Sequence, residues 1–162
     1  MAKRKQQLQN LSPTILNRRA HRDYQIVETL ECGIALTGTE VKSIRQGRVS
    51  LAEGFARTDP RTRELYLYNV DISPYPQAAP EFQHEPKRPR KLLARRREIE
   101  RLFGHTTSKG VTLIPTKMYF VRGKVKVEIA VATGKRHHDK RQDIKKKEAD
   151  REMRRAMSKR EI

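Results

Sequence analysis

The chain has 162 residues, and its 37 Lys or Arg outnumber its 19 Asp or Glu, which gives a formal net charge of +18. Cys32 is the only cysteine, which excludes an internal disulfide and a cysteine-based zinc site and fits a reducing cytosol. The basic start lacks the apolar stretch of a signal peptide, and no apolar run approaches membrane-spanning length. We therefore expect a cytoplasmic protein with no cofactor, no metal and no membrane partner.

The positive charge is concentrated in three segments. Residues 1–22 carry six Lys or Arg and no acid, residues 84–102 carry eight against three, and residues 135–162 carry twelve against six. In contrast, residues 23–83 carry nine acids against six bases. Clustered positive charge binds nucleic-acid phosphates by releasing counterions. The pattern predicts a nucleic-acid partner and binding that weakens steeply with salt.

The first predicted elements are two short strands, 24–31 and 33–37, with Gly33 allowing a break between them. A short helix then begins at Gly38 and ends at Gly47. The residues predicted to face inward on this helix are Val41 and Ile44, and those predicted to face outward are Lys42 and Arg45.

A second pair of strands, 51–57 and 64–70, flanks a turn signal at residues 59–62. Five prolines in residues 72–90 withhold backbone donors and predict an extended loop there.

A helix is predicted from Arg90 to Phe103, ending at Gly104, because Leu92, Ile99, Leu102 and Phe103 fall on one face. Two further strands, 111–121 and 125–132, form a hairpin. Together these elements predict a mainly β fold: a small OB-like antiparallel barrel with two or three peripheral helices and a basic tail. Fold alone does not settle function.

Four ordered stretches of the chain carry a family pattern. They are Asn-Arg-Arg-Ala-His-Arg-Asp-Tyr at 17–24, Gly-Thr-Glu-Val-Lys-Ser-Ile-Arg at 38–45, His-Glu-Pro-Lys-Arg-Pro-Arg-Lys-Leu-Leu at 84–93, and Gly-Lys-Arg-His-His-Asp-Lys-Arg at 134–141 with Ile144 and Lys145 following. This order and content resembles the SsrA-binding protein (SmpB) family, the bacterial partners of transfer-messenger RNA.

The resemblance implies a six-stranded Greek-key barrel and no catalysis. It implies a basic N-terminal arm (1–22), an RNA-binding barrel (23–134) and a basic tail (135–162) that is disordered in solution and helical on the ribosome. The implied function is to bind the tRNA-like domain of transfer-messenger RNA and deliver it to stalled ribosomes for trans-translation, with the tail in the empty mRNA channel. Elongation factor Tu with GTP is implied as an indirect partner through the RNA, and a monomer is expected.

The same resemblance assigns residues. The implied RNA-binding residues are Asn17, Arg18, Arg19, Glu31, Lys42, Arg45, Arg88, Arg90, Lys91, Leu93 and Lys126. The implied contacts with the ribosomal decoding centre are Gly134, Lys135, Arg136, His138, Asp139, Lys140 and Arg141. The basic tail residues implied to follow the mRNA channel are Lys145, Lys146, Lys147, Arg151, Arg154 and Arg155.

Several of these residues have a plainer interpretation. Glu31 repels phosphate, so it either accepts from a base amino group or 2′-hydroxyl, or braces a neighbouring Arg. Leu93 is either a core leucine on the predicted helix or a direct RNA contact. Arg88 and Arg90 straddle Pro89, which would hold their guanidinium groups at a fixed spacing for bidentate phosphate contacts. Residues 38–45 also fit an ordinary amphipathic helix.

Some residues depart from the family pattern or suggest other chemistry. Arg95, Glu128 and Thr133 replace residue types common in the family, which leaves their local contacts open. His137, His138 and Asp139 suggest a metal, but adjacent residues rarely converge on one ion, and stacking on RNA suits His138 better.

Two other functions compete with the adaptor. An enzyme acting on RNA is suggested by scattered side chains with acid-base capacity, namely His21, Asp23, His84, His105 and Asp139. A general single-strand binder of the OB type would display aromatic stacking platforms, and this chain has no Trp, four Phe and five Tyr.

Overall fold

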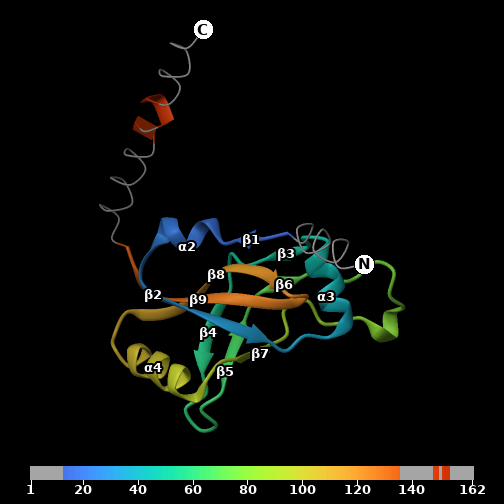
Figure 1. The fold of residues 1–162 in the computed structure, drawn as a ribbon, viewed down its shortest axis with the longest axis horizontal. Helices are drawn as coiled ribbons and strands as arrows, with labels where there is room; N and C mark the ends of the chain where they lie inside the picture. The colour runs from blue at the N-terminus through green and yellow to red at the C-terminus, as the bar shows by residue number, and fades with distance from the viewer. Residues whose placement is uncertain (1–12, 136–147, 150, 154–162) are drawn as a thin grey trace.

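The computed structural model describes residues 13–135, 148–149 and 151–153 (Figure 1). Its strands are β1 (Ile15–Leu16), β2 (Tyr24–Ile34), β3 (Val49–Ser50), β4 (Phe55–Thr58), β5 (Leu65–Tyr68), β6 (Asp71–Ile72), β7 (Arg90–Leu93), β8 (Val111–Val121) and β9 (Lys124–Gly134). Its helices are α2 (Arg18–Asp23), α3 (Gly38–Arg45), α4 (Arg96–Thr106) and the 3-10 turn η1 (Pro80–Phe82).

Six strands are paired in a cycle, all antiparallel. The neighbours around the cycle are β2, β7, β5, β4, β8 and β9, and β9 pairs again with β2. The cycle is weakest between β4 and β8, where Ala56 and Leu113 are the one matched pair, so the barrel is partly open there. Strands β4, β5 and β7 are antiparallel neighbours in chain order, and β7 then lies beside β2, which is a Greek-key arrangement. This confirms the predicted mainly β, OB-like fold, and β1 adds a short strand to β8.

The barrel interior is filled by side chains that alternate along each strand. On β5, Leu65 and Leu67 are fully buried, whereas Tyr66 and Tyr68 face outward and are half-buried. This period of two is the expected pattern for a sheet with one buried face. The largest buried apolar side chains of the interior are Ile44, Leu65, Leu67, Ile72, Leu92, Leu102, Leu113, Met118 and Ile129.

A second, smaller apolar cluster lies outside the barrel, beneath α2. Ala20 of α2 packs there with Ile114 of β8 and with Ala130 and Ala132 of β9. Small residues on β9 allow the helix to approach the sheet closely. The segment from β1 through α2 is therefore packed against β8 and β9 (Figure 1).

The strand break predicted at Gly33 is wrong, because β2 runs without interruption from Tyr24 to Ile34. The irregularity of β2 is instead a bulge between Ile26 and Glu28 in its pairing with β9. Gly33 is opposite Leu93 of β7, and a Cβ at Gly33 would lie 3.2 Å from the Leu93 Cβ. Glycine here allows two strands to approach closely and does not end a strand.

The predicted helix from Arg90 to Phe103 is also wrong at both ends. Residues 90–93 form β7, with Arg90 and Leu92 buried and Lys91 and Leu93 exposed. This alternation over four residues was overlooked because Leu92 also continues the helical spacing of α4. The helix starts at Arg96 and continues through Gly104 to Thr106. A Cβ at Gly104 would meet no neighbouring atom, so packing does not require a glycine at this position.

Other local predictions are confirmed. The turn after β4 is fixed by the Asp59 carboxylate, which accepts from the backbone N–H groups of Arg61 and Thr62. A two-residue turn joins β8 to β9, with positive φ at Arg122 and Gly123, the conformation favoured between twisted antiparallel strands. Helix α3 ends just before Gly47, whose φ is +71°.

The proline-rich segment 72–90 is mostly irregular, as predicted, but it contains η1 and is preceded by β6, which pairs with β3. In the tail, residues 148–149 and 151–153 are helical. Within the part of the chain that is described, no helix has both the length and the apolar character needed to cross a membrane.

Candidate nucleic-acid interface

A groove of about 760 Å³ lies on the outside of the barrel and collects four of the predicted RNA-binding residues. Glu31 reaches it from β2, Lys91 and Leu93 from β7, and Lys126 from β9. These strands are neighbours in the barrel, and the outward positions of each strand face the same side. The groove also has basic side chains outside the predicted RNA-binding set, namely Arg63, Arg95 and Arg96. The fold thus gathers residues that are up to 95 positions apart in the chain.

Leu93 is 52% exposed in this groove, so its interpretation as a core leucine is wrong. The neighbouring Leu92 is the core residue, at 1% exposure. Gly33 lies opposite Leu93 and has no side chain to cover it. An exposed leucine beside charged residues is available for apolar contact with a sugar or a base.

Glu31 is held in place by two neighbours. The Tyr119 hydroxyl donates to its Oε2, and the Lys126 ammonium lies 3.3 Å from its Oε1. The hydrogen bond from Tyr119, with help from Lys126, lowers the pKa of Glu31, and it raises the pKa of Tyr119 to about 12. Bracing was predicted with Arg as the partner; the partners are instead Tyr and Lys. A carboxylate has about four acceptor positions, so exposed Glu31 can still accept from a base amino group or a 2′-hydroxyl.

Lys91 has a similar local network. Its ammonium contacts Glu64 Oε1, while the Tyr66 hydroxyl donates to Glu64 Oε2 at 2.7 Å. The hydrogen bond to Glu64 raises the pKa of Lys91. Because all three groups are at the surface, phosphate can compete with Glu64 for Lys91 at little cost.

Helix α3 presents two exposed cations, as its spacing predicted. The Lys42 ammonium lies 5.1 Å from the centre of the Tyr75 ring, and the Arg45 guanidinium lies 5.7 Å from the centre of the Phe120 ring. Cations over aromatic rings are stabilised by the ring quadrupole. The rings come from the proline-rich loop and from β8, so sequence spacing could not have identified them.

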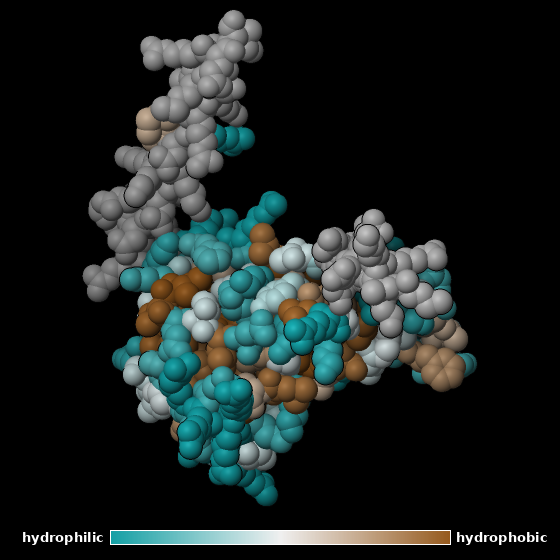
Figure 2. Space-filling model, viewed as in Figure 1, coloured by the Kyte–Doolittle hydropathy of each residue, from teal (hydrophilic) through white to brown (hydrophobic). Residues whose placement is uncertain are grey.

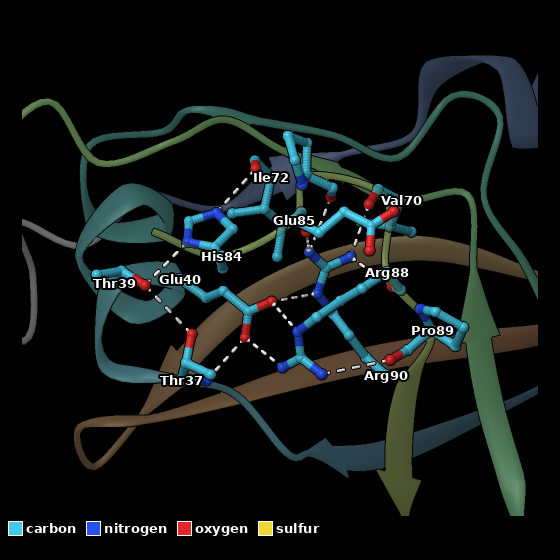
Figure 3. Close-up of polar contacts among 11 residues, drawn as sticks. Thr37, Thr39, Glu40, Val70, Ile72, His84, Glu85, Arg88, Pro89 and Arg90 are labelled. Carbon is cyan, nitrogen blue, oxygen red and sulfur yellow. Dashed lines mark hydrogen bonds and ion pairs between the residues drawn. The ribbon is translucent and has the colours of Figure 1, made fainter. Parts of the chain in front are cut away.

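Figure 3 shows a charged network in which Arg88 and Arg90 both point toward Glu40 of α3, and the Glu40 and Arg90 side chains are fully buried. Arg90 Nε donates to Glu40 Oε1 at 2.8 Å, and Arg88 donates to both Glu40 oxygens at 2.8 and 2.7 Å. The Thr37 backbone N–H also donates to Glu40. Burial alone would raise the pKa of Glu40, but the hydrogen bonds from Arg88, Thr37 and Arg90 outweigh it and lower this pKa.

Arg90 is fully buried, which removes it from the predicted set of phosphate contacts. Besides Glu40, its guanidinium donates to the carbonyl oxygens of Val70 at 2.7 Å and Pro86 at 2.8 Å. The rigid Arg-Pro-Arg backbone therefore directs both guanidinium groups inward, opposite to the prediction. Burial is the largest influence on Arg90 and lowers its pKa, while Glu40 opposes this change. Arg88 retains 29% side-chain exposure and can still meet a phosphate at its edge.

Asn17 is also inside the protein, at 5% exposure. Its side-chain amide donates to the carbonyl oxygens of Leu51 and Pro115, and its oxygen accepts from the N–H of Ala20 at the start of α2. Asn17 thus caps α2 and joins it to the barrel. It positions neighbouring basic residues and does not itself face a ligand.

Arg18 and Arg19 of α2 are exposed, and Arg19 pairs with Glu53. A second groove of about 550 Å³ runs beside them, with Gly134 and Lys135 at its rim. The backbone N–H of Lys135 donates to the Asp23 carbonyl, which continues the β2–β9 ladder to the root of the tail. The remaining predicted decoding-centre residues, Arg136, His138, Asp139, Lys140 and Arg141, lie outside the described residues. Of the predicted tail residues, Arg151 is helical and exposed, and Lys145, Lys146, Lys147, Arg154 and Arg155 lie outside that range.

The three departures from the family pattern have definite surroundings. Glu128 pairs with Lys117 at 2.8 Å and accepts from the Thr116 hydroxyl, so it is satisfied within the barrel. Arg95 lines the large groove, and its backbone N–H donates to Glu98 at the start of α4. Thr133 lies on β9 between Gln25 and Val111.

Of the side chains that suggested catalysis, Asp23, His84 and His105 each have a different partner, and Asp139 lies outside the described residues. His84 Nε2 faces the Ile72 carbonyl oxygen at 2.9 Å, so the proton is on Nε2, and Nδ1 accepts from the Thr39 hydroxyl. His105 lies against Glu28. Through its contact with Thr39, His84 ties the proline-rich loop to α3 (Figure 3). In the described segments, no group of three or more His, Cys, Asp or Glu could hold a metal ion.

Figure 2 shows that hydrophilic side chains cover much of one face, with apolar areas interspersed among them. The fold and the net charge of +18 together define a basic OB-like barrel protein. The family model of the SmpB protein matches residues 14–159 of this chain. The chain therefore belongs to the SmpB protein family.

Individual relatives agree with this assignment. An SsrA-binding protein of Carboxydothermus hydrogenoformans is 55% identical over 141 residues, covering 87% of this chain and 93% of that protein. An SsrA-binding protein of Geobacillus kaustophilus is 50% identical over 145 residues, covering 90% and 92%. A chain in a solved structure described as "tmRNA-SmpB: a journey to the center of the bacterial ribosome" has a TM-score of 0.66 and 45% identity, covering 82% of this chain and 95% of that one.

Proposed function

We propose that this protein is an RNA-binding adaptor that binds the tRNA-like domain of transfer-messenger RNA and delivers it to stalled ribosomes for trans-translation. The observation that carries the proposal is the groove in which Glu31, Lys91, Leu93 and Lys126 meet, in a chain of the SmpB family. The groove combines cations for phosphate, an exposed leucine and a braced acceptor. Such a mixture suits a folded RNA, which presents phosphates, 2′-hydroxyls and unstacked bases together.

The adaptor acts without catalysis, in the cytoplasm and as a monomer. Elongation factor Tu with GTP joins indirectly, through the RNA. We assign RNA binding to the barrel, residues 23–134, and the decoding centre and empty mRNA channel to the tail, residues 135–162, with the basic arm 1–22 as a supporting segment. The direct RNA contacts are the groove residues with Lys42 and Arg45. Arg90 and in part Arg88 hold α3 in place through Glu40, and Asn17 holds α2, which carries Arg18 and Arg19.

Binding to the isolated tRNA-like domain in physiological salt, in competition with elongator tRNA and unstructured RNA of equal length, tests this proposal. We expect preference for the tRNA-like domain. Equal affinity for all three RNAs, lost together as salt rises, would mean that charge alone drives binding.

A tail deletion tests the division of labour. Removing residues 136–162 leaves β9 and its Lys135–Asp23 hydrogen bond intact. We expect RNA affinity to be largely retained and peptide tagging in a translation assay to be abolished. Loss of all RNA affinity in a folded deletion variant would contradict this division.

A further inference from the structure

Three aromatic rings form a row on the outer face of β4 and β5. Phe55 and Tyr68 are paired across the two strands with their ring centres 5.3 Å apart and their planes at 16°, so they are stacked. Tyr66 follows Tyr68 on the same face, with ring centres 6.4 Å apart. The side chains between them, Ala56 and Leu67, point into the barrel. The three rings thus share one surface.

Packing does not explain these rings. None of them belongs to either hydrophobic cluster that is formed by the described residues. Phe55 is 37% exposed, and Tyr66 and Tyr68 are half-buried. Phe55 also borders a hollow of about 330 Å³ beside α4. An aromatic row that is exposed on a sheet face is available to a ligand with flat rings of its own.

The row is continuous with the large groove. Tyr66 is opposite Lys91 in the pairing of β5 with β7, and its hydroxyl donates to Glu64, which also contacts Lys91. Both Glu64 and Lys91 line the groove. An RNA strand leaving the groove past Lys91 would therefore meet Tyr66 first.

Charge beside the row matches a phosphate chain. Arg57 is opposite Tyr66 in the β4–β5 pairing and is exposed, and its guanidinium makes no hydrogen bond or ion pair with the residues that the structure describes. Cations flanking aromatic rings are the usual combination in proteins that bind unpaired nucleotides. Counted along the chain, β4 and β5 are the second and third of the six barrel strands. OB folds commonly bind oligonucleotides on that pair of strands.

We propose that Phe55, Tyr66 and Tyr68 form a stacking platform for unpaired nucleotides of the bound RNA, with Arg57 taking an adjoining phosphate. This inference rests on the proposed function, because RNA is the ligand in both. It adds a second contact surface on β4 and β5, outside the residue set implied by the family pattern.

Conservative variants of Phe55 test the platform. Phe55→Leu keeps apolar volume and removes the ring, whereas Phe55→Tyr keeps the ring. Phe82→Leu is the matched control, because Phe82 is 74% exposed in η1 and outside the row. Each full-length variant is titrated with the tRNA-like domain and with a blunt RNA duplex of equal length, after its thermal unfolding has been compared with wild type.

We expect Phe55→Leu to weaken binding of the tRNA-like domain roughly 5- to 30-fold, at the lower end of the effect of losing one base stack. Phe55→Tyr, Phe82→Leu and duplex binding should stay within about 2-fold of wild type, since a duplex offers no unpaired base. Should Phe55→Leu be unstable, Tyr66→Leu provides the same comparison, because it also removes one ring of the row.

Three results would overturn the platform. The first is unchanged affinity in both Phe55→Leu and Tyr66→Leu; the second is an equal loss for duplex and tRNA-like RNA. The third is a wild-type dimer that Phe55→Leu converts to a monomer, which would make the row a contact between copies of the chain. A Lys126→Ala variant separates the two proposals: if it weakens binding while neither Phe55→Leu nor Tyr66→Leu does, the platform fails and the adaptor stands. If wild type shows no preference for the tRNA-like domain, the adaptor fails.

Discussion

Replacing Glu40 by glutamine should strongly destabilise the barrel without changing its surface. Glu40 and Arg90 are both fully buried, 2.8 Å apart, and 50 positions apart in the chain. Glutamine has almost the same shape but leaves the Arg90 cation without a counter-charge. Removing one partner of a buried ion pair costs about 3–5 kcal/mol, compared with a typical total stability of about 5–15 kcal/mol. For a domain of this size the loss corresponds to a fall in Tm of roughly 10–20 °C.

The assay is urea and thermal unfolding of wild type and Glu40→Gln, with Glu100→Gln as a control. Glu100 pairs with Arg96 at the surface, and such pairs contribute about 1 kcal/mol or less. The difference should also depend on pH. Because the folded-state pKa of Glu40 is lowered, its contribution is complete above the ordinary value of 4.5 and is lost as the pH falls through the folded-state pKa. The gap between wild type and Glu40→Gln should therefore narrow in acid.

A Glu40→Gln variant that melts within about 3 °C of wild type at neutral pH would refute this reasoning, because it would mean that Arg90 needs no counter-charge. So would a gap that widens in acid. If Glu40→Gln loses RNA affinity at temperatures where it is still folded, Glu40 also positions α3 for RNA binding through its contact with Arg88.

Three further outcomes are expected. Gly104→Ala should raise the free energy of unfolding by up to about 1 kcal/mol and raise Tm slightly, because Gly104 lies exposed within α4 with open space at its Cβ position. Gly54→Ala should lower Tm, since its Cβ would lie 2.6 Å from a Val70 methyl group. Equal Tm shifts in the two variants would contradict the packing. Tyr119→Phe should weaken binding of the tRNA-like domain several-fold with little change in Tm. In an ultraviolet titration, wild type should show one tyrosine that ionises late, and Glu31→Gln should lack it. Unchanged affinity in Tyr119→Phe would mean that Glu31 needs no bracing. Cys32 is fully buried and its pKa is raised to about 12, so a thiol reagent should react with it slowly under native conditions and rapidly in urea; fast native labelling would contradict its place in the core.

The parts of the fold that sequence could predict are those fixed by neighbours in the chain. The turns at Asp59 and at Arg122-Gly123 lie where turn chemistry places them, and the strands beside them follow. Residues 90–93 were misassigned because four residues are too few to separate a period of two from a helical period. Their strand character comes from pairing with β5 and β2, which lie elsewhere in the chain.

In the candidate site, too, sequence could predict the properties that depend on neighbours in the chain and could not predict those that depend on distant segments. Lys42 and Arg45 are exposed as helical spacing predicted, because that property depends on one helix. Arg90 was misjudged because its environment depends on Glu40, whose burial no local pattern announces. Tyr119 was missed for a related reason: it meets Glu31 only through the pairing of three strands. The groove itself is a product of the barrel and has no signature in any single segment.

The attachment of the tail to β9 has a mechanical consequence. β9 is paired on both sides, with β2 along one edge and β8 along the other, and its last rung is the Lys135 N–H donating to Asp23. Tension applied to the tail along this strand would load two ladders of hydrogen bonds in shear, so that many bonds bear the force at once. A strand at a free edge would instead peel away one bond at a time. The central place of β9 thus makes the barrel a firm anchor for a segment that is pulled.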